Sequence, residues 1–184
     1  MKRFLAVLLV LMMLIAVCSC DKNDTNETTE ESSKQSVATT KEESVKTKAF
    51  TKKNMTITLP ENFKETTVQG YTVCYESNDA WVLALREAFS LEQGFSNWTL
   101  DQYADVIRTN SAANSPTQIS HENDLTSIEH SFFNEDENLT YKYFVAVYKS
   151  SDAFWMIQFS CTEDNYDAYR ASFIEWAKSV EFSA

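Results

Sequence analysis

Glycine and proline are scarce in this sequence, which has two of each among 184 residues. Phosphate-binding loops, dinucleotide-binding turns and the nucleophile elbow of hydrolases need closely spaced glycines, because the backbone turns sharply there or approaches a ligand. Gly70 and Gly94 lie too far apart to form such a loop. We therefore expect no nucleotide cofactor and no catalytic activity of these classes.

Basic residues are also few: 16 lysines and arginines stand against 27 aspartates and glutamates, for a formal net charge of −11. A surface this acidic repels nucleic acid and anionic lipid headgroups. We expect no nucleic-acid partner, and any contact with a membrane should come from a separate anchor.

Only two histidines are present, His121 and His130. His130 alternates with apolar residues in a predicted strand, as an interior imidazole would. A cation site could combine His121, Glu122 and Asp124 with a carboxylate from residues 135–137. Their spacing matches neither a zinc motif nor a calcium loop, so we expect a solvated acidic rim and no metal.

The amino terminus carries the clearest signal in the chain. Lys2 and Arg3 precede an uncharged run from Phe4 to Val17, which has the length of a signal peptide and is short for a membrane span. We predict a signal peptide over residues 1–19, and therefore export from the cytoplasm.

Residues 15–20, with the sequence IAVCSC, resemble the lipobox of bacterial lipoproteins. Cys20 follows the small Ser19 and has Val17 three positions before it, whereas Cys18 directly follows the bulkier Val17. The resemblance implies cleavage before Cys20 and attachment of acyl chains to its thiol, with Cys18 as the alternative. The chain would then sit on the outer face of the cell membrane; an ordinary secretory signal is the other interpretation.

The next stretch, residues 20–46, contains no aromatic residue and few apolar ones. Such a composition cannot bury enough surface to offset the entropy lost on ordering, so we predict a disordered tether. A flexible chain of this length spans on the order of 25–30 Å.

Residues 47–184 are predicted to form one α+β domain with an antiparallel sheet flanked by helices. The capping box formed by Thr99 and Gln102 marks the start of the first helix. The predicted strands cover residues 55–59, 63–68, 71–76, 80–88, 125–133, 139–149 and 153–161, and the helices cover 99–110 and 163–180.

The segments MTITLPENF at 55–63, WMIQF at 155–159 and SVEF at 179–182 resemble the PsbP-like α/β/α sandwich. That fold occurs in a photosystem II extrinsic subunit, a nuclear-import factor and bacterial lipoproteins of the LpqN type. The resemblance implies a non-enzymatic adaptor or assembly factor, and it transfers no binding residue to this chain.

Cys74 and Cys161 both lie on predicted strands. An extracytoplasmic location would permit a disulfide between them. Cys161 also shares a strand face with large apolar residues, where a free cysteine packs as a small hydrophobic residue. The sequence leaves the pairing open and favours free thiols.

The segment from Phe89 to Trp98 is unusually apolar for a loop. We predict that Phe95 and Trp98 rim a groove between the first helix and the sheet and bind a partner there. The expected function is that of a lipid-anchored binding or assembly module for an envelope protein or a small apolar ligand. The alternatives are an envelope hydrolase with a histidine-assisted nucleophile and a stalked surface protein without a soluble ligand.

Overall fold

The computed structural model describes residues 45–111 and 118–183. The signal peptide, Cys18, Cys20 and nearly all of the tether lie outside the described residues, so the expectations about them stay predictions. No helix in the described ranges has the length and apolar character needed to span a membrane.

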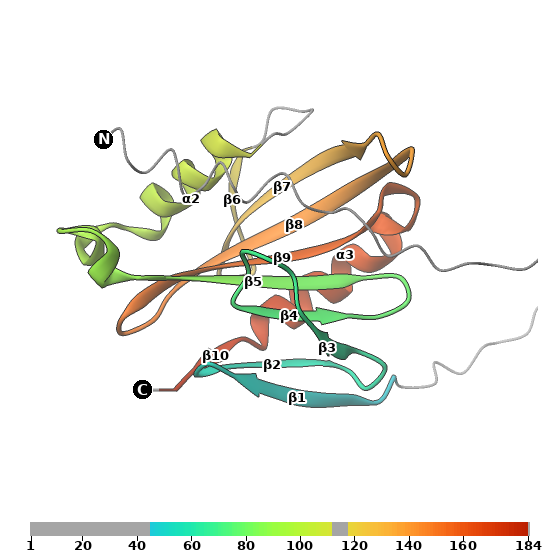
Figure 1. Ribbon diagram of the computed structural model, residues 1–184, viewed down its shortest axis with the longest axis horizontal. Coiled ribbons are helices and arrows are strands. Elements are labelled where there is room, and N and C mark those ends of the chain that lie inside the picture. Colours follow the sequence, from blue (N-terminus) through green and yellow to red (C-terminus); the bar gives the residue numbers. More distant parts are fainter. Residues whose placement is uncertain (1–44, 112–117, 184) are drawn as a thin grey trace, which may run out of the picture.

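A seven-stranded antiparallel sheet forms the centre of the domain (Figure 1). Its order is β3-β4-β5-β9-β8-β7-β6, so the long strands occupy the middle and short ones lie at both edges. The strands are β3 (Lys64–Thr66), β4 (Val73–Glu76), β5 (Trp81–Ala88), β6 (Ile119–Glu122), β7 (Leu125–Asn134), β8 (Leu139–Lys149) and β9 (Ala153–Thr162).

Helices cover the two faces of this sheet. Helix α2 (Leu100–Asn110) begins at the predicted capping box, where Thr99 Oγ1 accepts from the Gln102 amide and the Gln102 side chain accepts from the Thr99 amide. Helix α3 (Glu163–Lys178) packs on the other face, with acidic residues in its first turn and Lys178 in its last, as the helix dipole favours. The predicted PsbP-like α+β fold is confirmed.

A second, three-stranded sheet lies beside the first (Figure 1). It joins β1 (Thr47–Lys52), β2 (Met55–Pro60) and β10 (Glu181–Phe182), in the order β1-β2-β10. Of these, the sequence predicted only β2, because β1 is mostly exposed and β10 has only two residues, so neither shows an apolar alternation. The edge strand β6 was missed because three of its four residues are exposed.

Side chains along the central strands point alternately to the two faces of the sheet, and each face has its own apolar core. Residues such as Phe154 and Met156 face α2, whereas Trp155, Ile157 and Phe159 face α3 and the small sheet. All nine residues from Ala153 to Cys161 are buried, which explains the continuous apolar run in β9. We call the two sides the α2 face and the α3 face.

Glu129 ties β7 to helix α3 across the α3 face. Its carboxylate accepts from Tyr166 Oη at 2.6 Å and from Arg170 Nη2 at 2.8 Å. Burial alone would raise the pKa of Glu129, but the bonds from Arg170 and Tyr166 outweigh it, so the pKa is lowered. These contacts fix the helix against the strand.

Candidate functional site

The segment between β5 and α2 contains two short 3₁₀ turns, η2 (Phe89–Leu91) and η3 (Phe95–Asn97). Phe95 is 5% exposed. Its ring lies with its centroid 5.0 Å from that of Phe154 and 5.1 Å from that of Trp98. Phe95 therefore belongs to the core beneath α2.

This burial corrects the expectation that Phe95 presents its ring to a partner. The segment precedes the first turn of α2, and its Phe95 ring fills the space next to Phe154 and Tyr103, which no side chain of the helix fills. Trp98 is half-buried and keeps part of its surface. A partner contact through Trp98 stays a prediction.

Lys149 at the end of β8 fixes this segment to the sheet. Its ammonium donates to the carbonyl oxygens of Ser96 at 2.7 Å and Trp98 at 2.9 Å. It also lies 5.3 Å from the centre of the Phe154 ring, within the range of a cation–π contact. The charge is thereby held by the protein rather than left free for a ligand.

An open groove of about 510 Å³ lies beside the first turn of α2. It runs between the first turn of α2, the ends of β7 and β8, and β10. The apolar lining comes from Leu100, Leu125, Val147 and Phe182, and charged residues on its walls are Asp124, Lys149 and Glu181. A groove beside the first helix therefore exists, but neither Phe95 nor Trp98 lines it.

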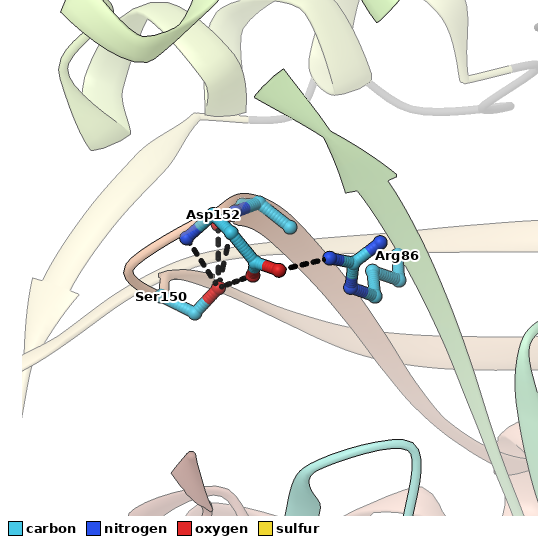
Figure 2. Close-up of polar contacts among 4 residues, drawn as sticks. Arg86, Ser150 and Asp152 are labelled. Carbon is cyan, nitrogen blue, oxygen red and sulfur yellow. Dashed lines mark hydrogen bonds and ion pairs between the residues drawn. The ribbon is translucent and has the colours of Figure 1, made fainter. Parts of the chain in front are cut away.

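The β8–β9 turn forms one wall of this groove and is held in place by polar contacts (Figure 2). Ser150 Oγ accepts from the amide of Ala153 at 3.1 Å and lies 3.1 Å from Asp152 Oδ1. Arg86 Nη2 on β5 donates to Asp152 Oδ2 at 2.5 Å. The turn that forms this wall is thus tied to the central strand β5.

Thr126, another lining residue, lies next to His121. Thr126 Oγ1 is 3.5 Å from His121 Nδ1, and His121 Nε2 is 3.5 Å from Asp101 Oδ1. The order hydroxyl, imidazole, carboxylate is that of a hydrolytic triad. Both distances lie at the outer limit of a hydrogen bond, and the His121 and Asp101 side chains are each 60% exposed, so water competes for every contact. We interpret the three as surface neighbours rather than an activated nucleophile.

His130 is an interior histidine, as its strand position predicted, with 7% of its surface exposed. Its ring stacks on Tyr143 with a centroid distance of 4.8 Å. Burial lowers the pKa of His130 to about 4, so the imidazole is neutral at physiological pH. Its Nδ1 has no hydrogen-bond partner in the part of the chain that the structure describes, and no hydroxyl or thiol there pairs with it.

Cys74 and Cys161 are buried free thiols. Strand register explains why they do not pair. Cys74 pairs with Leu83 of β5, which in turn pairs with Gln158 of β9, and all three side chains point to the α2 face. Cys161 lies three residues after Gln158 on β9, so its side chain points to the opposite, α3 face. Burial raises the pKa of Cys161 to about 11, so this thiol is unreactive at neutral pH.

The cation site considered from the sequence is not assembled. His121 and Glu122 are consecutive strand residues and point to opposite faces, and Glu122 is paired with Arg170 of α3. The acidic turn at 135–137 lies at the opposite end of β7 from Asp124. Within residues 45–111 and 118–183, no group of three or more histidine, cysteine, aspartate or glutamate side chains could hold a metal ion.

A second aromatic surface was not recognised in the sequence. Trp81, Phe132 and Tyr141 are half-buried on the α2 face, and Leu139 beside them is 43% exposed. The lengths of the elements could have predicted it. A helix of eleven residues spans about 16 Å and a strand of ten residues about 34 Å, so one such helix cannot cover this face of the sheet. We call these four residues the aromatic end of the sheet.

No protein family matches the chain, and no curated protein does. Among solved structures, it is similar to cyanobacterial PsbP (CyanoP) from Synechocystis sp. PCC 6803, with a TM-score of 0.50 and 10% identity over 80% of this chain and 99% of that one. A protein from Bacteroides thetaiotaomicron VPI-5482 gives a TM-score of 0.49 at 9% identity and covers 71% of this chain and 46% of its own. At such low identity the likeness to CyanoP concerns architecture alone: the chain has a PsbP-like α+β fold.

Proposed function

We propose that this protein is a lipid-anchored module on the extracytoplasmic face of the cell membrane that binds an envelope partner without catalysing a reaction. The anchor rests on the amino-terminal sequence, in which a basic pair and an uncharged run lead to Val17, Ser19 and Cys20. The tether of residues 20–46 would hold the domain close to the membrane surface.

The open groove beside α2 carries the binding part of the proposal. Its walls are apolar at Leu125 and Phe182 and charged at Asp124 and Glu181, a mixture typical of a surface that receives a peptide segment or a small apolar ligand. The Arg86–Asp152 contact gives one wall a fixed position before any partner arrives. A preformed surface loses less entropy on binding.

An envelope hydrolase is the second candidate, and Thr126 beside His121 is the observation that favours it. We prefer the binding module because the exposed imidazole and carboxylate are surrounded by water, which weakens the electrostatic help that a nucleophile needs. A stalked surface protein without a ligand would leave the groove without a role.

Site-specific cross-linking in native membranes tests the groove. Ser151→Cys places a thiol on the groove wall, and Ala171→Cys places a matched one on the exposed side of α3. The native Cys74 and Cys161 are buried, so they give little background. A thiol-directed photo-cross-linker should join a partner to Ser151→Cys and not to Ala171→Cys. Equal products from both variants, or none from either, would contradict the proposal.

A further inference from the structure

The aromatic end of the sheet extends across four neighbouring strands, β5, β9, β8 and β7, and its aromatic side chains come from β5, β8 and β7. The rings of Trp81 on β5 and Tyr141 on β8 meet edge to face, with centroids 5.8 Å apart. Phe132 on β7 lies directly opposite Tyr141 in the strand register. Leu139, two residues before Tyr141, extends the same face. The surface is therefore built on paired strands rather than on a loop.

Helix α2 lies over the other half of this face. Its Tyr103 donates to Glu87 at 2.6 Å and stacks on Phe154 at 4.6 Å, and both of these residues lie at the end of the sheet opposite Trp81. The strands that α2 contacts most extensively are β6, β7 and β8. Among the described elements, neither helix packs on the aromatic end.

Carboxylates surround this end of the sheet. Glu76 is level with Trp81 on the neighbouring strand, and the turn between β7 and β8 contributes residues 135–137. Tyr141 donates to Glu137 at 2.6 Å, which links the ring to the acidic turn. In the described part of the chain, none of these carboxylates forms a salt bridge. Their negative charge is therefore not neutralised within the domain.

Lysines nearby do not cancel this charge. Lys142 points to the α3 face, where its ammonium lies 4.4 Å from the centre of the Tyr166 ring. Lys64 on the edge strand β3 pairs with Glu76. Among the described strands, it is the single basic residue on the α2 face that lies in register with these carboxylates. The net local charge stays negative.

His130 provides a second, independent observation at the same place. It lies level with Tyr143, Ser160 and Trp81 in one row across the sheet, next to the row that holds Tyr141 and Phe132. The side chain is more than nine-tenths buried, and its Nδ1 has no partner among the described residues. Buried polar atoms are nearly always paired, so this Nδ1 needs a partner from outside the described residues, which a bound water or a ligand group can supply.

We propose that the aromatic end of the sheet docks a cationic protein segment, with lysine or arginine side chains lying on the rings of Trp81 and Tyr141 and paired with the surrounding carboxylates. Aromatic faces attract cations, and arginine both stacks on rings and binds carboxylates in pairs. Nucleic acid and anionic lipid are repelled by the same charge. This surface is distinct from the groove, which lies at the opposite end of the sheet.

Binding of labelled peptides to the full-length protein in detergent tests the proposal. The probe is a twelve-residue peptide with four arginines separated by serine and glycine, followed by fluorescence anisotropy. Trp81→Leu should weaken binding at least tenfold, and Trp81→Phe should restore most of it. Phe89→Leu removes a half-buried ring just after the end of β5 that is opposite Trp81, and it should leave the affinity unchanged.

Charge variants separate a specific site from general attraction to an acidic protein. Replacing Glu135, Asp136 and Glu137 by their amides should weaken binding at least tenfold. The same change at Glu61, Asp105 and Glu175, all exposed and elsewhere on the domain, should have little effect. The proposal is overturned if the two triple variants lose affinity equally, if Trp81→Leu binds like the wild type, or if the peptide does not bind. Near-ultraviolet circular dichroism verifies that each variant is folded.

Discussion

The imidazole of His130 is neutral and buried on the α2 face of the sheet. Because it is buried, its protonation is coupled to the stability of the folded domain. Burial lowers its folded-state pKa to about 4, while an unfolded histidine titrates near 6.5. The unfolded chain therefore binds a proton over this interval while the folded chain does not. The contribution to stability is complete above about pH 6.5 and is lost as the pH falls toward 4.

We expect His130→Phe to flatten this part of the stability profile. Wild-type protein should lose up to about 3 kcal/mol of unfolding free energy from this group between pH 6.5 and 4, whereas the variant should not. Urea denaturation at several pH values measures the difference. His121→Ala is the control, because that side chain is 60% exposed. An identical slope for wild type and His130→Phe would show that the imidazole is accessible to protons in the folded state.

Helix α2 depends on an aromatic side chain from outside its own sequence. Phe95 in η3 packs against both Phe154 and Tyr103, and the helix itself contributes few large apolar side chains to its core. Isolated helices of eleven residues are marginal in water, so α2 is stable because of this packing.

The Phe95→Ala substitution should therefore destabilise the domain by about 3–5 kcal/mol through loss of buried surface and a residual cavity. Trp98→Ala should cost less, because part of this residue is already exposed to solvent, although tryptophan is the larger side chain. Chemical denaturation of both variants measures the order. A larger loss for Trp98→Ala would mean that the core beneath α2 is organised around Trp98 instead of Phe95.

For the whole molecule, the decisive residue is the proposed anchor. Cys20→Ala should prevent acylation and leave the protein either unprocessed or released into the medium, with the fold of residues 45–183 unchanged. Cys18→Ala is the matched control and should remain acylated, because Cys18 would leave with the signal peptide. Labelling with a clickable fatty acid and fractionation of cells measure both outcomes. Acylation that survives Cys20→Ala and is lost in Cys18→Ala would move the anchor to Cys18.

Two surfaces at opposite ends of one sheet give the proposed module its overall organisation. The groove lies at the end of the large sheet that contains Val147, next to Phe182 of the small sheet, and the aromatic end lies around Trp81 and Tyr141. The rigid sheet between them can hold two binding partners at a fixed separation. An adaptor that assembles envelope components requires this property.

The sequence by itself predicted the order and type of the main elements, since alternation along β7, β8 and β9 and the capping box at Thr99 are local patterns. Edge strands such as β1 and β6 were missed because exposed residues show no such alternation.

Tertiary structure decided which side chains are buried and which meet. Phe95 became a core residue because the chain folds it under α2, and Cys74 and Cys161 stay apart because strand register sends them to opposite faces. The aromatic end is not covered by a helix because α2 is shorter than the strands beneath it. Each of these outcomes depends on distances between residues far apart in the chain, which local patterns do not encode.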